Sequence, residues 1–261
     1  MQITRRDFLL AGGMAAAGSA IGKPTRSSIG VRQLTELDDG QGEYTASSYI
    51  QDGLEVLWDG IENIGYGMHD FNSTHWVNLA GNSSFDMTVQ PSWNDFGLVF
   101  DGTWCAKAPK SDLRFCTIEC VCSGVERSSN YLCFGWSYQG GDQRRSILIN
   151  PSAQLVRCYL DSRTFDGIFI DNIFSSSISL GGNGSTIFLN GEQNMKSNLV
   201  SSSGITFNRF RLAGYGTKSD GDAPEFFYRG TVFRCAIYSR ALSAEEIAYN
   251  YMIDKARFNL P

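Results

Sequence analysis

The sequence predicts an all-β protein in which two antiparallel sheets pack face to face. Short runs of alternating apolar and polar residues, typical of half-buried strands, recur between turn-forming residues. Aromatic residues make up 13% of the 261 residues, and 28 glycines accompany only 6 prolines, which suits many strands joined by tight turns. A helical pattern stands out near the C-terminus, after these runs. This order favours a sandwich of eight or more strands over alternating strand and helix units.

The individual strands follow from local alternation. The first is expected at Leu54, Val56 and Trp58, which alternate with Glu55 and Leu57. Further strands are predicted at Leu98–Phe100, Arg114–Val121, Tyr131–Tyr138, Arg145–Asn150, Gln154–Leu160 and Ile205–Leu212. Each is short and is followed by polar or glycine-containing residues, as expected for strands that turn back on their neighbours.

The clearest hairpin signal is Thr186–Leu189 followed by Asn190 and Gly191. Asparagine and glycine accept the positive φ angles that a two-residue type I′ turn requires, so we expect a hairpin here. The serine runs Ser175–Ser177 and Ser201–Ser203 are predicted to be connecting loops.

The most regular alternation lies at Arg229–Tyr238, near the C-terminus. One predicted face holds Thr231, Phe233, Cys235 and Ile237, and the other holds Val232, Arg234, Ala236 and Tyr238. Burial of Phe233 and Ile237 would stabilise the fold by roughly 1.5–3 kcal/mol each. We therefore expect a closing strand whose Phe233 side chain lies on the inner face of a sheet.

A helix is predicted to follow this strand. Ser243 precedes a helical pattern, and Glu246 stands three residues later. This spacing forms a capping box, in which the serine accepts from the backbone and the glutamate reaches back to it. The chain should therefore end as strand, short turn and amphipathic helix.

This C-terminal run, GTVFRCAIYSRALSAEEIAYNY, resembles the closing strand and helix of the bacterial laminin-G-like (LamG, pentraxin-like) domains. The matching positions are Gly230, Tyr238, Arg240, Ala241, Leu242, Ser243, Glu245 and Glu246. The segment 46–82 resembles the opening of the same family, with Trp76, Leu79, Gly81 and Asn82 in the expected places. The resemblance covers both ends of residues 46–261, and the middle matches only in the rhythm of its strands.

The resemblance implies a two-sheet antiparallel jelly-roll sandwich of the concanavalin A-like lectin and glucanase type, with a short C-terminal helix. Family members bind sugars, proteins or calcium, or serve only as structure, so the likeness specifies the fold more than the function. The expected division is a domain at residues 46–261, preceded by a polar linker at residues 23–45 that is rich in Gly, Ser and Thr.

Residues 1–22 resemble a twin-arginine (Tat) export signal. Arg5 and Arg6 are followed by the apolar pair Leu9 and Leu10 and then by a weakly hydrophobic Gly/Ala run that is too short and mild for a membrane span. Such a signal implies export of the folded protein by the Tat translocase, to the periplasm, the cell surface or the medium. A cytosolic helix start is the alternative interpretation.

Charge argues against nucleic acid as a partner. The net charge is −5, and both signs are scattered along the chain. Arg144-Arg145 and Arg209 with Arg211 are isolated pairs, which we interpret as solvated or strand-edge charges because nucleic-acid sites cluster many more cations.

The seven cysteines are interpreted mainly as small apolar core residues. Cys116, Cys120 and Cys122 share strand parity with Ile118, so all four should point the same way. A disulfide from Cys116 or Cys120 to Cys133 is the alternative. Zinc is disfavoured because no Cys-x₂-Cys pair or nearby histidine completes a ligand set. The odd total leaves at least one thiol unpaired.

Catalytic patterns are incomplete. The histidines are His69 and His75, and no Gly-x-Ser-x-Gly elbow accompanies them. Retaining glycosidases on lectin-like scaffolds carry Glu-x-Asp-x-x-Glu on one strand. Here Asp59 and Glu62 are present, but Leu57 stands where the first glutamate is needed.

The candidate ligand-binding residues lie in the loop after the first strand. They are Asp59, Glu62, Tyr66, His69, Asp70 and Trp76, with a calcium ion predicted at Asp59, Asn63 and Asp70. Carboxylate and amide oxygens suit calcium, and aromatic faces suit a sugar ring. The alternative is that the acids and amides cap turns. Trp93, Trp104 and Trp136 are interpreted as packing residues.

These observations predict an exported, non-catalytic binding module whose ligand is a carbohydrate, with structural calcium as a further expectation. Two alternatives stay open: a surface adhesion or assembly module that binds protein, and a glycoside hydrolase on a lectin scaffold. A sugar binder should show exposed aromatic rings beside clustered polar groups, a protein binder a flat apolar patch, and an enzyme two facing carboxyl groups.

Overall fold

The structure is a computed structural model that describes residues 44–81, 84–87, 89–107, 113–123, 132–138, 144–150, 153–161, 163–168, 173–181, 184–198, 205–207, 209–215 and 226–261. The chain divides into the units Met1–Gly40 and Gln41–Pro261, and the described residues all belong to the second. The predicted export signal and nearly all of the predicted linker therefore lie outside the described residues.

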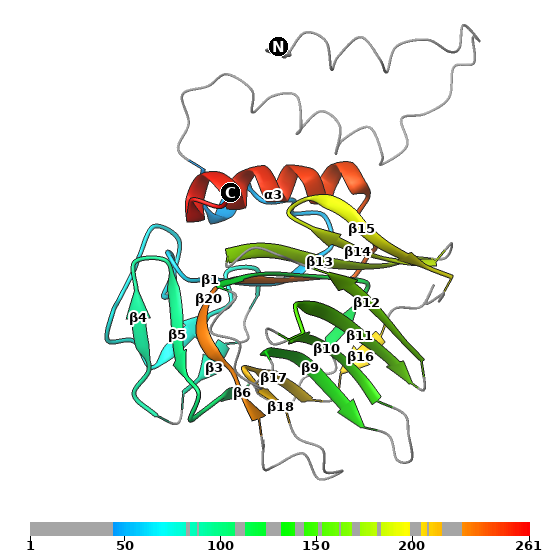
Figure 1. Ribbon diagram of the computed structural model, residues 1–261. Coiled ribbons are helices and arrows are strands. Elements are labelled where there is room, and N and C mark those ends of the chain that lie inside the picture. The colour runs from blue at the N-terminus through cyan, green and yellow to red at the C-terminus, as the bar shows by residue number, and fades with distance from the viewer. Residues whose placement is uncertain are drawn as a thin grey trace, which may run out of the picture. The chain divides into compact units, whose positions relative to one another are not determined.

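Within the described residues, the strands form two eight-stranded sheets, and the paired strands run antiparallel (Figure 1). Sheet I has the order β15 (Glu192–Ser197), β14 (Gly184–Leu189), β13 (Ile173–Gly181), β8 (Thr117–Ser123), β20 (Arg229–Tyr238), β5 (Gly97–Asp101) and β4 (Ser92–Asn94). The remaining strand, β1 (Leu54–Asp59), pairs with the second half of β20. The predicted closing strand is therefore central to this sheet.

Sheet II has the order β12 (Arg163–Ile168), β11 (Leu155–Asp161), β10 (Arg144–Asn150), β9 (Leu132–Tyr138), β17 (Arg209–Leu212), β6 (Ala106–Lys107), β3 (Ser84–Asp86) and β2 (His75–Val77). Two small ladders join β7 (Leu113–Phe115) to β16 (Ile205–Phe207) and β18 (Gly214–Tyr215) to β19 (Phe226–Phe227). The predicted all-β sandwich is confirmed.

The main core lies between the two sheets. Inward positions from both sheets form one apolar cluster, which includes Trp58, Leu98, Ile118, Cys120, Cys122, Ile178 and Ile237 from sheet I and Trp76, Phe85, Ile149, Val156, Cys158 and Leu212 from sheet II. Cys120, Cys122 and Ile118 do point the same way, as their spacing predicted. Rings of four strands meet in this core, with the centroids of Trp58 and Phe85 4.0 Å apart and those of Trp76 and Trp93 5.3 Å apart.

The alternation of β20 is interrupted by a β-bulge, which corrects one prediction. Val232 pairs with Cys122 but Arg234 pairs with Val121, so Phe233 is an extra residue in this strand. As a result Cys235 and Ile237 lie in the main core, whereas Phe233 lies on the opposite side of the sheet. The prediction that Phe233 shares a face with those two residues was wrong, because one inserted residue reverses the parity of a strand.

The predicted hairpin is confirmed, and one predicted loop is corrected. Asn190 and Gly191 have φ angles of 50° and 76°, both positive as a type I′ turn requires. The run Ser175–Ser177 is part of β13 rather than a loop. Its small hydroxyl side chains suit a strand that lies beneath a helix, where there is little room and hydrogen-bond partners are near. The run Ser201–Ser203 lies outside the described residues.

The predicted C-terminal helix is α3 (Ala244–Phe258), and its capping box is confirmed. The Ser243 hydroxyl accepts from the Glu246 amide, and the Glu246 carboxylate accepts from the Ser243 amide at 2.8 Å. The helix ends at Asn259, whose φ of 53° is left-handed. Figure 1 shows α3 across sheet I, on the side away from β9–β12. Phe233 stacks on Phe258 here, with ring centroids 5.7 Å apart.

Candidate functional site

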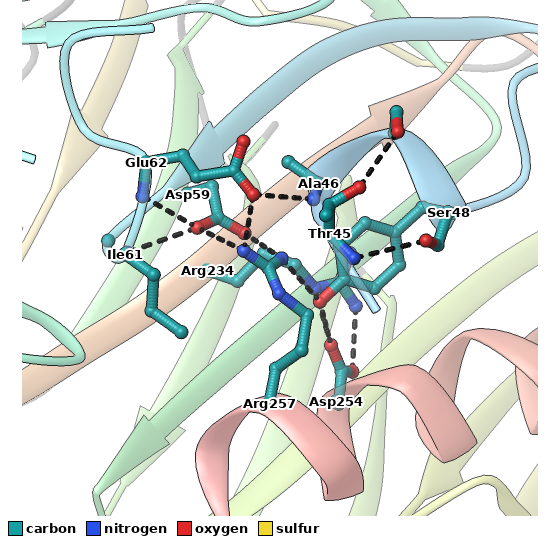
Figure 2. A network of polar contacts seen from close by, with 12 residues as sticks. Thr45, Ala46, Ser48, Asp59, Ile61, Glu62, Arg234, Asp254 and Arg257 are labelled. Carbon is teal, nitrogen blue, oxygen red and sulfur yellow. Dashed lines mark hydrogen bonds and ion pairs between the residues drawn. The ribbon is translucent and has the colours of Figure 1, made fainter. Parts of the chain in front are cut away.

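A buried ionic network fills the space between α3 and sheet I (Figure 2). Arg234 of β20 lies on this side, where it binds Asp254 of α3 through two hydrogen bonds of 2.7 and 2.8 Å. The same guanidinium donates to Glu119 of β8 at 3.0 Å. Side-chain exposures of 0–1% show that these charges are sealed from water. Such a network fixes the helix to the sheet through paired charges rather than apolar contacts alone.

A second arginine from the helix binds the loop that follows β1. Arg257 donates to Asp59 through both terminal nitrogens, and to Glu62 at 2.8 Å. The Glu62 carboxylate also accepts from the backbone amide of Ala46, which begins the 3₁₀ helix η1 (Ala46–Ser48). Tyr49, which follows η1, donates its hydroxyl hydrogen to Asp254. The first described segment, the loop and the last helix are thus tied together.

Burial and charge act in opposite directions on these groups. Burial raises the pKa of Asp59 above its usual value of 3.8, and the Arg257 charge opposes this rise. Burial also raises the pKa of Glu119, against the effect of Arg234. Burial alone would lower the pKa of Arg234, but the charges of Asp254 and Glu119 outweigh it and raise that pKa. The guanidinium therefore stays charged, and each carboxylate depends on its arginine.

The loop itself is held at several points by buried side chains. We call Gly65–Asn72 the rim loop. The Glu62 carboxylate accepts from the amide of Gly67 at 2.9 Å. The Asn63 carboxamide makes two hydrogen bonds of 2.9 Å to the backbone of Asp70, one as donor and one as acceptor. Glu62 and Asn63 are both buried, so they fix the backbone of the rim loop from below.

The rim loop displays apolar side chains to solvent on this rigid base. Tyr66, Met68 and Phe71 are 49%, 52% and 53% exposed. The His69 ring lies behind them, with its centroid 4.3 Å from that of Phe71, and its Nδ1 atom is 3.0 Å from the Gly60 carbonyl oxygen. A surface of this kind, held in place before any ligand arrives, loses little conformational entropy on binding.

The structure separates the predicted site residues into two groups. Tyr66, His69 and Asp70 belong to the rim loop. Asp59, Glu62 and Trp76 lie beneath it, buried, with the Trp76 indole donating to the Asp59 carbonyl at 2.9 Å. Sequence reasoning missed Met68 and Phe71, because residue type alone does not distinguish an exposed apolar side chain from a buried one.

The three predicted calcium ligands do not form one ligand set. Asp59 binds the Arg257 guanidinium and accepts from the amides of Ile61 and Glu62, so its oxygens cap a turn. The oxygen of Asn63 is used by the Asp70 backbone. A calcium ion would also have to lie beside a buried guanidinium. Within the described ranges, no group of three or more His, Cys, Asp or Glu residues is placed to hold a metal ion.

A second exposed polar cluster lies on the outer face of sheet II, and sequence reasoning missed it. Arg157 of β11 binds Asp166 of β12 through hydrogen bonds of 2.7 and 2.6 Å. Its guanidinium also lies over the Tyr159 ring, 5.8 Å from the centroid, and donates to the Tyr159 hydroxyl at 3.4 Å. Arg157 and Asp166 are only partly exposed, at 36% and 31%. Their pairing depends on strand register, which no local sequence pattern announces.

The core thiols carry no evident chemistry. Cys120, Cys158 and Cys235 are buried and have free thiols, so a disulfide from Cys120 to Cys133 is not formed. Burial raises the pKa of Cys235 to about 12, against the opposing charge of Arg234. A protonated, inaccessible thiol is a poor nucleophile and metal ligand.

The close carboxylates do not resemble a hydrolase site. Glu119 and Asp254 meet at Arg234, and Asp59 and Glu62 meet at Arg257. All four carboxyl groups are buried away from solvent, and each binds an arginine. A glycosidase needs its two carboxyl groups on either side of a sugar in an open cleft.

The structure is an antiparallel β-sandwich with an aromatic loop exposed at its surface. No family model matches the chain, and no curated protein matches it. Among solved structures, Trypanosoma rangeli sialidase is similar at a TM-score of 0.58 and 14% identity, over 86% of this chain and 38% of that one. The same enzyme in complex with sialic acid matches at 0.57 and 15%, over 78% and 33%.

This likeness concerns the fold alone. The chain spans 33–38% of the length of the sialidases that it matches. The Ruminococcus gnavus IT-sialidase CBM40 bound to alpha2,3 sialyllactose matches over 53% of this chain and 83% of that one, with 16% identity. Its TM-score of 0.43 is too low to carry an argument. Within the described ranges, no helix has both the length and the apolar character needed to cross a membrane.

Proposed function

We propose that the chain is an exported, non-catalytic module of the laminin-G-like type that binds carbohydrate. The observation that carries the proposal is the rim loop. It exposes two rings, Tyr66 and Phe71, and the Phe71 ring lies against His69, on a backbone fixed by buried hydrogen bonds. Aromatic faces pack against the apolar faces of sugar rings, and neighbouring polar groups bind the hydroxyls.

Export by the Tat route is part of the same proposal, because the route delivers folded proteins. Its support is the twin-arginine pattern at Arg5 and Arg6. Replacing this pair with Lys-Lys should stop export, and normal secretion of that variant would remove the assignment.

The binding test is a glycan array probed with the full chain, followed by titration of any positive glycan. Tyr66→Ala and Phe71→Ala should each weaken binding on the order of tenfold, the effect of losing one aromatic contact. Met252→Ala is the matched control, because Met252 is equally exposed at 52% but lies on α3. Unchanged binding in both rim-loop variants would reject the rim loop as the sugar site.

A protein-binding adhesion module is the second candidate, favoured by one observation. Met68 adds exposed apolar surface within the rim loop, and Phe96 is an exposed apolar residue whose backbone lies close to Gly60 in the preceding segment. An array without any positive glycan, together with saturable binding of the chain to a cell-surface protein that Phe71→Ala abolishes, would favour this candidate over carbohydrate binding.

A further inference from the structure

The rim loop contains a buried hydrogen-bonding atom that no described group uses. The Nδ1 atom of His69 lies 3.0 Å from the Gly60 carbonyl oxygen, and this oxygen can only accept, so we place the ring hydrogen of the neutral imidazole on Nδ1. The other ring nitrogen, Nε2, is then an acceptor without a hydrogen. It is buried and has no hydrogen-bond partner among the described residues. Such atoms are uncommon in folded proteins, because a buried polar atom without a partner is costly.

Two rings pack against His69, and they differ in their freedom to move. The Trp93 ring, with its centroid 6.4 Å from that of His69, is buried, and its indole donates to the Ser73 carbonyl at 2.8 Å. The Phe71 ring lies closer, with its centroid at 4.3 Å, but Phe71 is 53% exposed. Exposed side chains change rotamer within picoseconds to nanoseconds. Phe71 is therefore the neighbour that can turn aside and let a ligand reach Nε2.

The other polar side chains of the rim loop are mostly acceptors as well. Tyr66 donates its hydroxyl hydrogen to the Leu79 carbonyl at 3.0 Å, which leaves the phenolic oxygen to accept. The Asp70 carboxylate takes the Asn72 amide at 2.8 Å and has further lone pairs but no hydrogen. Among the side chains of this loop, which is described throughout, only that of Asn72 is left with a hydrogen to donate. The loop therefore suits a ligand that donates hydrogen bonds.

The charge around the loop acts in the same direction. Residues 33–106, which include the rim loop and β1–β5, contain no Lys or Arg. Arg257, which binds the base of the loop, is already held by two carboxylates, those of Asp59 and Glu62. Asp70 adds a third carboxylate within the loop. An acidic ligand would meet like charges here, and this segment supplies no cation to pair with it.

We propose that the rim loop binds a glycan without acidic groups, and that His69 Nε2 accepts a hydrogen bond from one of the glycan hydroxyls. The inference rests on the proposed carbohydrate-binding function and names the ligand class of the same loop. Once Phe71 has turned aside, a hydroxyl donates to Nε2, and the Phe71 ring is free to pack on an apolar face of the sugar. A carboxylate or sulfate group has no hydrogen to donate, so it would leave Nε2 unpaired and would also meet like charges. His69 thereby discriminates against acidic glycans.

The first test uses pairs of glycans that differ only in an acidic group. The full chain is titrated with lactose and alpha2,3 sialyllactose, and with each positive glycan of one to three rings and its uronic-acid or sulfated form. We expect the acidic member of a pair to bind on the order of tenfold more weakly, or worse. Equal or tighter binding of the acidic members would overturn this inference and leave carbohydrate binding in place. An array without any positive glycan would reject the proposed function, and the inference with it.

Variants of His69 test the acceptor itself. His69→Asn keeps an amide that can donate to the Gly60 carbonyl but has no acceptor at the place of Nε2, so binding should weaken on the order of tenfold. His69→Gln carries a carboxamide oxygen that reaches further and should restore part of the loss. His75→Asn makes the same change at the other histidine, on β2 outside the loop, and should have no effect. Thermal melting of each variant separates a lost contact from a lost fold. Binding by a folded His69→Asn that equals the parent would reject His69 as the acceptor.

A measurement on the free protein separates this inference from the proposed function. The ¹⁵N NMR shifts of the His69 ring report which nitrogen carries the hydrogen, and we expect it on Nδ1. A bound glycan should then shift the Nε2 signal, because that atom gains a hydrogen bond, and should leave the Nδ1 signal nearly unchanged. A free protein in which Nε2 carries the hydrogen would overturn the inference, whether or not a glycan binds.

Discussion

The two outer faces of the sandwich carry the same arginine–aspartate pair in opposite surroundings. Arg234 binds Asp254 with hydrogen bonds of 2.7 and 2.8 Å, and Arg157 binds Asp166 with 2.7 and 2.6 Å. The first pair is fully buried beneath α3, and the second is about one third exposed. Geometry is therefore nearly constant, and only the access of water differs. The comparison shows that the same bond can be sealed beneath a helix in one place and be reached by water in another.

The largest effect is expected from removal of the buried guanidinium. Arg234→Met leaves Glu119 and Asp254 facing one another without a counter-charge in a site sealed from water. Breaking a buried ion pair in this way costs about 3–5 kcal/mol of unfolding free energy. Chemical denaturation of the variant and the parent measures the difference.

A compensated variant sharpens this test. Arg234→Met combined with Glu119→Gln and Asp254→Asn removes all three charges, so no buried carboxylate is left uncompensated, and most of the lost stability should return. If Arg234→Met alone were as stable as the parent, the network would contribute nothing and the contrast between the two faces would disappear.

The next largest loss of stability is expected from Glu62→Ala, which changes the contact between the buried network under α3 and the rim loop. Glu62→Ala removes the acceptor of the buried Ala46 amide and of the Gly67 amide, and it takes one carboxylate from Arg257. Leaving a buried donor unsatisfied costs about 1–3 kcal/mol. We also expect faster hydrogen exchange at Gly67, because the rim loop loses one of its anchors.

Glu245→Ala is the matched control, since Glu245 is exposed in the first turn of α3. It should leave the hydrogen-exchange rate at Gly67 unchanged. It should change the unfolding free energy by at most about a few tenths of a kcal/mol. Slow exchange at Gly67 in Glu62→Ala would show that the rim loop does not depend on the ionic network.

These tests concern the part of the molecule that sequence analysis predicts least well. Most strands, the Asn190-Gly191 turn and the Ser243 cap are local patterns, and the structure confirms them. The predicted strands Arg114–Val121 and Ile205–Leu212 are each divided between two strands of different sheets. The network joins residues as far apart as Tyr49 and Asp254, separated by 205 positions. The alternation of β20 does predict that Arg234 lies opposite Cys235 and Ile237, but Phe233 joins it on the helix side only because a bulge inserts one residue. No local pattern marks such an insertion.

The prediction of the candidate site was incomplete for the same reason. The loop after β1 could be singled out by its carboxylates and rings, and Tyr66, His69 and Asp70 do share the rim loop. Which acids lie below the loop and which lie at its surface depends on α3, almost two hundred residues later along the chain.

A third ion pair, Arg240–Glu246, is buried to an intermediate degree, and it tests how such a pair depends on pH. Glu246 binds Arg240 with both oxygens, and their side chains are 16% and 30% exposed. Burial alone would raise the pKa of Glu246, but Arg240 and the Ser243 amide outweigh it and lower that pKa below its usual 4.5. The unfolded chain therefore binds the proton more readily, and the stabilising contribution is present above pH 4.5.

As the pH falls from 4.5 through the lower pKa of the folded state, this contribution should be lost. We expect the parent to exceed Glu246→Gln in stability by about 1 kcal/mol at pH 6, as for a helix cap, and the difference to vanish in acid. Urea unfolding of both proteins between pH 6 and pH 3 measures this. A difference that persists at pH 3 would show that the carboxylate charge is not its source.

The smallest effect is expected at the exposed pair, and it completes the comparison. Asp166→Asn and Asp254→Asn make the same chemical change to two bonds of the same geometry. Because water replaces the lost charge at Arg157, Asp166→Asn should cost at most about 1 kcal/mol, and less in 1 M salt, where screening acts over about 3 Å. Asp254→Asn should cost several times more at either salt concentration, since the buried Arg234 then keeps only Glu119 as its counter-charge. Equal losses in the two variants would mean that bond geometry, not the access of water, determines what each pair contributes.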